Sequence, residues 1–359
     1  MKKSKKVKVI DLFCGIGGIT RGFVDEGFNV VAGIDFVESC RFGYEKNNNG
    51  AKFIHKDIRK VTGEELTALY NNDCDIKILV GCAPCQPFSG INSNKVDYFF
   101  DSEKANTRSP LDKFASLIEK TQPHIVSMEN VANLANMEKY PAFKHFLDVL
   151  TKNGYETDYK IVDTSTYGIP QKRKRLVLLA SKLGKIKLID PTHKKPITLR
   201  EAIGHLPKIG IGEIHPDDPY HRTQTMNTIN TERIKYIPKN GGNLKGAPDY
   251  LIPECHKKAS GKTYSSSVYA RMKWDEPSPT LTTQCLGIGN GRYGHPEQDR
   301  AISLREAAMI QTFPQDYEFV EDTSNYCLQK VVKYIGNAVP VKLGQVIAQS
   351  IKIHLNSIS

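Results

Sequence analysis

The sequence of 359 residues lacks the features that would place the protein in a membrane or outside the cell. No apolar run approaches the roughly 20 residues that a helix needs to cross a bilayer. The N-terminal lysines lead into a short apolar run that Asp11 interrupts, which is not the pattern of a secretory signal. Eight cysteines without such a signal indicate a reducing compartment. We therefore expect a cytoplasmic protein with no membrane partner.

The sequence also has too few acidic residues to balance its basic ones, and it has no internal repeat or low-complexity tract. The formal net charge is +11, of which +5 falls in residues 1–184, +6 in residues 185–297 and none in residues 298–359. The middle segment is the most basic per residue, which favours a polyanionic partner. Charge alone does not distinguish DNA from RNA.

The chain length predicts about two domains, and the pattern of apolar residues changes near residue 184. Before that point, short β-branched runs alternate with helical patterns, and we expect strands at 8–13, 29–34, 76–80, 125–128, 155–163 and 176–180. Beyond it the chain is rich in proline and glycine, with a helix predicted at 199–206 and β-like pieces such as 235–237. Helical patterns resume at 303–313 and close the chain. The sequence thus predicts a large α/β domain and a smaller, loop-rich, basic one.

Cys85 follows the apolar run 76–80, in a loop at the carboxyl end of a predicted strand, where open α/β sheets keep their chemistry. Pro84 and Pro87 restrict the backbone on both sides, which suits a positioned thiolate nucleophile. The loop alone leaves two alternatives open: a buried structural cysteine, and a redox or zinc pair with Cys82. A zinc site needs four ligands, and no second closely spaced Cys/His pair accompanies Cys82 and Cys85. A thioredoxin-like pair would begin a helix, which Pro87 fits poorly.

Two carboxylates also end predicted strands. Glu129 follows the run 125–128, and by itself is an ordinary strand-end glutamate. Asp57 follows a third short strand, and by itself favours a cap for a helix over residues 62–70.

Four consecutive cations precede the apolar run 176–180. Strand alternation would place Arg173 and Arg175 on one side and Lys172 and Lys174 on the other. Such a run is ordinarily a solvated face, but here it adjoins a buried strand.

A glycine-rich turn follows the first predicted strand. Gly15 and Gly17 allow a close backbone approach to a ligand at a helix N-terminus. Asp35 ends the second strand about 20 residues later, where nucleotide-binding folds place a ribose-binding carboxylate. Thr20 occupies the third glycine position of G-x-G-x-x-G, which weakens a nicotinamide or flavin interpretation.

Six motifs in chain order resemble those of the cytosine-5 DNA methyltransferases, particularly the single-chain bacterial modification enzymes. They are Asp11–Gly18, Pro84–Ser89, Glu129–Val131, Gln171–Arg175, Arg305–Pro314 and Gly336–Pro340. The resemblance implies a doubly wound mixed sheet, the Rossmann-like fold of S-adenosylmethionine-dependent methyltransferases, with no metal. It implies a cofactor-binding and catalytic domain over residues 1–184 plus 325–359. A target-recognition domain would occupy residues 185–324.

The resemblance also implies the chemistry. Cys85 would add to carbon 6 of a cytosine, which makes carbon 5 nucleophilic. Glu129 would hydrogen-bond ring nitrogen 3 and the exocyclic amine, and Arg173 and Arg175 would hold the base. The long polar loop 86–111 would close over a cytosine flipped out of the duplex.

The cofactor contacts implied by the resemblance are Phe13 with adenine, Gly15 and Gly17 with the methionine part, Asp35 with the ribose, Asp57 and Ile58 with adenine, and Phe36, Asn337 and Val339 nearby. Many family members carry glutamate where this sequence has Asp35. The implied partner is duplex DNA. We further expect a monomer in the bacterial cytosol or nucleoid, and a cognate restriction endonuclease that acts on the same site without direct contact.

Two other functions remain open at this point. A transfer-RNA cytosine-5 methyltransferase shares the same catalytic set, although the basic segment 185–297 favours duplex DNA. A catalytically silent DNA-binding regulator is disfavoured because Cys85, Glu129, Arg173 and Arg175 occur together.

Overall fold

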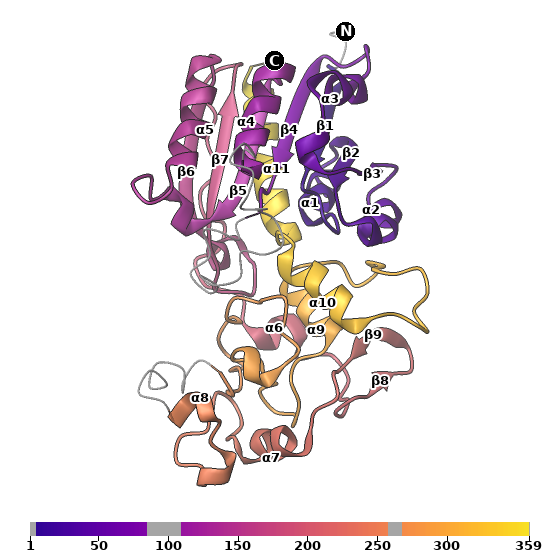
Figure 1. Cartoon of the computed structure of the whole chain (residues 1–359), viewed down its shortest axis with the longest axis vertical. Helices are drawn as coiled ribbons and strands as arrows, with labels where there is room; N and C mark the ends of the chain where they lie inside the picture. The colour runs from indigo at the N-terminus through magenta and orange to yellow at the C-terminus, as the bar shows by residue number, and fades with distance from the viewer. Residues whose placement is uncertain (1–4, 85–108, 258–267, 359) are drawn as a thin grey trace, which may run out of the picture. The chain divides into compact units, whose positions relative to one another are not determined.

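The computed structural model describes residues 5–84, 109–257 and 268–358 (Figure 1), and these divide into two compact units. The sheet unit comprises Met1–Asp163, Lys174–Pro191 and Val341–Ser359, and the loop unit comprises Thr164–Arg173 and Thr192–Pro340. Residues 341–359, at the end of the chain, thus group with the sheet unit. Residues 164–173 and 325–340, which the resemblance assigns to the cofactor-binding and catalytic domain, group with the loop unit.

The sheet unit is built on a mixed seven-stranded sheet in the order β3-β2-β1-β4-β5-β7-β6. Its strands are β1 Val7–Leu12, β2 Asn29–Asp35, β3 Lys52–His55, β4 Ile76–Gly81, β5 Ile125–Val131, β6 Glu156–Asp163 and β7 Lys174–Ser181. Strands β1 to β5 run parallel to one another, and β7 pairs antiparallel with both β5 and β6. The central strands are almost wholly buried, as expected for a sheet covered on both faces.

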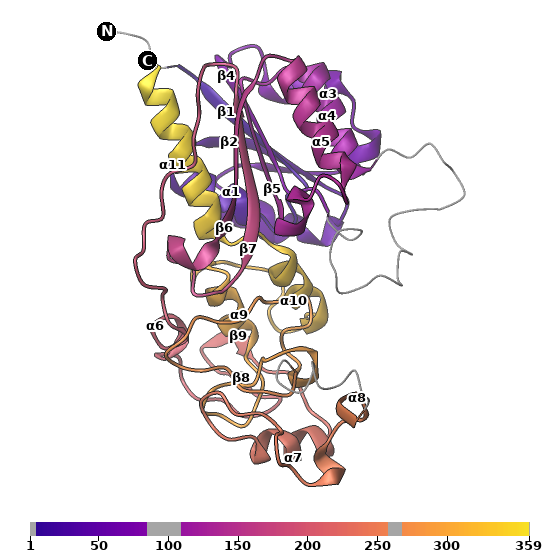
Figure 2. The ribbon, with the colours of Figure 1, turned by 90° about the vertical axis from the view of Figure 1, so that its left-hand side faces the viewer.

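Helices cover the two faces of this sheet. They are α1 Gly18–Asp25, α2 Arg41–Asn47, α3 Gly63–Tyr70, α4 Pro110–Thr121, α5 Pro141–Lys152 and α11 Val341–Ser357. Figure 2 shows α3, α4 and α5 on one side of the sheet and α11 on the other. The arrangement confirms the predicted doubly wound α/β fold.

Helices α1 and α11 touch through their backbones. A Cβ added to Gly22 would lie 2.6 Å from the carbonyl oxygen of Val341, and one added to Gly344 would lie 2.9 Å from that of Ile19. Real Cβ atoms do not approach backbone so closely, so only glycine permits this spacing. The resemblance led us to expect the C-terminal helix beside the first, and α11 lies there.

Side chains cap the helix starts on the other face. The Ser109 hydroxyl accepts from the backbone N–H of Asp112 at the start of α4. Thr62 does the same for α3, with Glu65 completing the capping box. The prediction that Asp57 caps this helix was therefore wrong, because Asp57 caps the short 3₁₀ turn Ile58–Lys60 that precedes it.

The strand register aligns the groups at the carboxyl ends of β1, β4 and β5. Leu12 pairs with Gly81, and Gly81 pairs with Met128, so these residues form one row across the sheet. The next residues are Phe13, Cys82 and Glu129. This row lies at the carboxyl edge where the strand order reverses between β1 and β4, the usual place for ligands in such sheets.

The loop unit has little regular structure. Its elements are α6 Leu199–Ile203, β8 Ile214–His215, β9 Asp218–Arg222, α7 Thr228–Tyr236, α8 Glu254–Lys257, α9 Leu304–Ile310 and α10 Leu328–Asn337. Residues 235–237, which the sequence suggested were β-like, instead end α7. The Asn227 side chain caps that helix, and Ile234 is its fully buried anchor.

Buried charges hold the loop unit together. Arg271 is fully buried and donates to the carbonyls of Ile237, Ile234 and His295 and to other acceptors. Arg300 makes a two-point ion pair with Glu306, at 2.8 and 2.7 Å. Burial alone would raise the pKa of Glu306, but the Arg300 charge outweighs it and lowers that pKa to about 2. Buried ion pairs and hydrogen bonds thus stabilise the loop unit in addition to its buried apolar side chains.

Candidate active site

The turn after β1 has a strained backbone. Phe13 has a φ of +60°, an uncommon value for a bulky side chain, and its N–H donates to the carbonyl of Ile34 at 2.8 Å. Gly15 and Gly17 have φ values of +50° and +92°, and Gly17 caps α1. A Cβ on Gly15 would meet nothing within 4 Å, so open space adjoins the turn there. Strain of this kind gathers at ligand sites.

Asp35, at the end of β2, ties this turn to the neighbouring strand. Its carboxylate accepts the N–H of Gly15 and the N–H of Val37, each at 2.9 Å. Burial raises the pKa of Asp35, and these hydrogen bonds partly oppose that rise. Phe36, the next residue, keeps 48% of its surface exposed. The Asp35 carboxylate therefore lies beside Gly15, and the half-exposed Phe36 ring follows it in the chain.

The side chain of Asp57 is hydrogen-bonded within the 3₁₀ turn that it caps. Its carboxylate accepts the N–H of Arg59 at 2.9 Å and pairs with the guanidinium of the same residue at 2.6 Å. These hydrogen bonds lower the pKa of Asp57. Ile58 beside it is buried. The adenine contact predicted for this pair remains a prediction.

A buried acid that the sequence reasoning missed lies beneath the turn. Asp11 on β1 is 1% exposed, and its Oδ2 accepts the Thr20 hydroxyl at 2.7 Å. Burial raises the pKa of Asp11 to about 7. Threonine at the third glycine position therefore has a structural role here, because its hydroxyl donates to one oxygen of this buried acid. The presence of an acidic residue within the otherwise apolar segment at β1 could have indicated this buried carboxyl group from the sequence.

A second group of predicted site residues lies around Glu129. It is 2% exposed at the carboxyl end of β5. Nε of Arg175, on β7, lies 2.9 Å from Oε1 as an ion pair. The thiol of Cys82 donates to Oε2 at 2.7 Å. Oε1 has no aligned hydrogen bond from any residue in the described ranges, which leaves it able to accept one.

Asn130 links this carboxylate to the loop after β4. Its side-chain amide donates to the carbonyl of Ala83 at 3.2 Å, and its side-chain oxygen accepts the N–H of Val131. Ala83 stands two residues before Cys85, which itself lies outside the described residues, as do Gln86 to Arg108. The chain that leads to the predicted nucleophile is therefore anchored beside Glu129.

The remaining predicted residues belong to the loop unit. Arg173 is buried, and its Nη1 donates to the Leu281 carbonyl at 3.4 Å. Burial alternates through this segment as predicted, with Lys172 and Lys174 exposed. Asn337 is exposed at the end of α10, and Val339 is buried. The roles of Arg173, Asn337 and Val339 remain predictions.

Several arginines that could have contacted DNA hold the loop unit instead. Arg271 is fully buried. Arg233 donates to the carbonyl of Leu251 and lies over the Tyr269 ring. Arg222 lies over the ring of Tyr326. Net charge therefore overstates the number of cations in this unit that are free to meet a polyanion.

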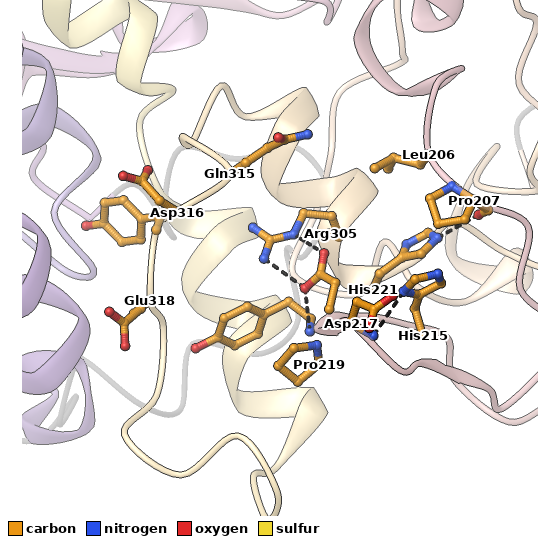
Figure 3. A pocket seen from close by; sticks show the side chains of 13 residues that line it. Leu206, Pro207, His215, Asp217, Pro219, His221, Arg305, Gln315, Asp316 and Glu318 are labelled. Carbon is orange, nitrogen blue, oxygen red and sulfur yellow. Dashed lines mark hydrogen bonds and ion pairs between the residues drawn. The ribbon is translucent and has the colours of Figure 1, made fainter.

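A cavity of about 440 Å³ opens in the loop unit (Figure 3). Arg305 pairs with Asp218 in its wall, at 2.6 and 2.9 Å. Asp217, Asp316 and Glu318 add further carboxylates to the lining. Because this wall is acidic, it would repel phosphates, and we do not assign it to DNA binding.

Within the described residues, no group of three or more His, Cys, Asp or Glu side chains is arranged so that it could hold a metal ion. Within the same ranges no helix has the length and apolarity to cross a membrane.

The doubly wound mixed sheet, with a glycine turn after its first strand and carboxylates at its strand ends, defines a Rossmann-like S-adenosylmethionine-dependent methyltransferase fold. A solved structure of the Entamoeba histolytica methyltransferase EhMeth superposes with a TM-score of 0.65 at 16% identity, covering 98% of this chain and 99% of that one. The family model of the C-5 cytosine-specific DNA methylases matches residues 7–353. The chain belongs to this family, and it is an enzyme of the DNA (cytosine-5) methyltransferase class.

Named relatives agree with that assignment. The type II methylase M.HgiDII of Herpetosiphon aurantiacus is 48% identical over 353 residues, which cover 98% of this chain and 96% of that protein. The type II methyltransferase M1.HphI of Haemophilus parahaemolyticus is 29% identical over 349 residues, covering 95% and 86%.

Proposed function

We propose that this protein is a type II modification methyltransferase that transfers a methyl group to carbon 5 of a flipped-out cytosine in a defined duplex sequence. The observation that carries the proposal is the buried Glu129 carboxylate. It lies between Arg175 and Cys82, at the strand edge from which the chain runs directly to Cys85. The type II names of the relatives support the modification role.

The chemistry follows from the inertness of carbon 5. The Cys85 thiolate forms a bond to carbon 6, which raises the electron density at carbon 5 and lets that carbon take a methyl group. Loss of the carbon 5 proton then expels the thiolate and restores the ring. Charge develops on the ring during this addition. The base must leave the duplex first, because both carbons react through the faces of the ring, which the neighbouring bases cover in the stack.

Glu129 is suited to stabilise that charge. Its Oε1 is buried and lacks an aligned hydrogen bond within the described chain, so it can accept from the exocyclic amine of a bound cytosine. Arg175 fixes the carboxylate from β7. A preorganised, water-excluded group of this kind acts on developing charge without reorganising. Arg173 is proposed to hold the base carbonyl.

The described residues fit S-adenosylmethionine. It supplies an electrophilic methyl group when bound. The open space at Gly15 would take its methionine part, and the Asp35 carboxylate beside that turn would accept ribose hydroxyls, with the exposed Phe36 ring as a further contact. We assign Phe13, Gly17, Asp57, Ile58, Asn337 and Val339 as further contacts.

Target recognition is proposed for residues 185–324, most of which lie in the loop unit. Exposed lysines of this segment would contact phosphates, since its buried arginines are occupied. DNA affinity should therefore fall steeply with salt through counterion release. We expect a cytosolic monomer that protects sites cut by a cognate endonuclease.

A methyl-transfer assay tests the proposal. Purified protein is given S-adenosylmethionine with a tritiated methyl group and either duplex DNA or transfer RNA, and bisulfite sequencing then locates the modified base. We expect label in cytosines of one DNA sequence and none with Cys85→Ala. Label in RNA alone would favour the transfer-RNA enzyme, and no label in either substrate would favour a silent DNA-binding protein.

A further inference from the structure

The thiol of Cys82 is a second cysteine group at the active site, separate from the predicted nucleophile. Cys82 directly follows β4, and its backbone N–H donates to the carbonyl of Leu12 on β1 at 3.3 Å. The next residue, Ala83, is buried and accepts the side-chain amide of Asn130 on β5. The backbone of Cys82 is thus held by the strands on both sides, so one side-chain torsion alone decides where its sulfur lies.

That sulfur contacts the carboxylate of Glu129. Sγ of Cys82 is 2.7 Å from Oε2 of Glu129, while Nε of Arg175 is 2.9 Å from Oε1. The two oxygens are therefore held by groups from different strands, one from the end of β4 and one from β7. An arginine contact to one oxygen leaves the carboxylate plane free to turn about its last torsion. A contact to the second oxygen removes that freedom.

We propose that Cys82 is a positioning residue for the methyl-transfer reaction, which fixes the rotation of the Glu129 carboxylate by donating its S–H to Oε2. The inference rests on the proposed role of Glu129. Because Glu129 is 2% exposed, water does not readily replace a lost donor. A misaligned carboxylate would still allow substrate to bind but would stabilise the transition state less well. The effect should therefore fall on kcat and not on KM.

The test compares Cys82→Ala with Cys82→Ser, which keeps a donor at the same position. Cys74→Ala is the matched control, since Cys74 precedes β4 as Cys82 follows it and is likewise a partly buried cysteine. Steady-state kcat and KM are measured for a duplex substrate, and S-adenosylmethionine binding is measured by calorimetry. We expect Cys82→Ala to lower kcat about tenfold, as for loss of one hydrogen bond to a charged group. Cys82→Ser should stay within about threefold of the parent, and KM and cofactor affinity should be unchanged.

A double mutant shows whether Cys82 acts through the carboxylate. In a Glu129→Gln background, Cys82→Ala should cost much less than in the parent, because the group it orients has already been changed. An equal cost in both backgrounds, or equal losses for Cys82→Ala and Cys82→Ser, would overturn the inference in favour of simple packing. A normal kcat for Cys82→Ala beside a slow Glu129→Gln would overturn it while the proposed function stands. A normal rate for Glu129→Gln itself would overturn both.

Discussion

Replacing Arg175 with alanine tests whether electrostatics at the active site set the rate. The pair it forms with Glu129 spans 2.9 Å, and the two side chains are only 12% and 3% exposed. Removing one partner of such a buried pair costs about 3–5 kcal/mol, because the other charge stays buried without compensation. If that loss falls on the transition state, the rate constant for methyl transfer should drop by about 10²- to 5 × 10³-fold. Arg175→Lys keeps the charge but loses the planar fork, so its loss should be intermediate.

Single-turnover methyl transfer with saturating DNA and cofactor is the suitable assay, because it separates chemistry from product release. Lys174→Ala is the matched control, since Lys174 is the exposed neighbour on the same strand, and its rate should stay within about twofold of the parent. Urea unfolding of each variant shows how much of the loss falls on stability instead. A parent-like rate for Arg175→Ala, with Glu129→Gln slow, would refute the reasoning.

Three further outcomes concern stability, each measured by urea unfolding. Burial raises the pKa of Asp11 to about 7, so the folded state binds a proton that the unfolded state releases between about pH 4 and pH 7, and stability falls as pH rises through that window. Asp11→Asn removes this slope and should be more stable than the parent at pH 8, by up to about 4 kcal/mol, and by less at pH 5; an equal difference at both pH values would contradict the assignment. Gly22→Ala should destabilise by more than about 2 kcal/mol because its Cβ meets α11 backbone, whereas Asn356→Ala on the exposed side of α11 should change little; equal effects would contradict the close helix contact. Arg271→Lys should cost about 3 kcal/mol or more, since lysine cannot reach the several carbonyls that the guanidinium satisfies, and a stable variant would mean that these hydrogen bonds are dispensable.

The positions of most strands in the sheet unit could be predicted from the sequence, because buried parallel strands are short β-branched segments such as residues 76–80. Strand-end groups could be predicted for the same reason. Their alignment could not, because register depends on pairing between distant segments. Only the pairing of Leu12 with Gly81 and of Gly81 with Met128 brings Cys82 and Glu129 into one row.

Local competition explains the errors. Asp57 and Thr62 are both residue types that cap helices. Thr62 is the N-cap of α3 because it forms a capping box with Glu65. The end of α7 has β-branched neighbours, yet the Asn227 cap and the buried Ile234 give a helix. Arg271 counts as a cation in the sequence, although its burial makes it a structural group.

Trapping with 5-fluorocytosine tests the central claim, covalent attack by Cys85, most directly. Fluorine replaces the proton that must leave carbon 5, so a duplex with this base at the target should hold the protein in an adduct that survives denaturing electrophoresis. We predict that the adduct requires S-adenosylmethionine, is lost in Cys85→Ala, and still forms, more slowly, in Cys82→Ala. An adduct formed by Cys85→Ala would mean that another of the eight cysteines attacks, and it would contradict the account.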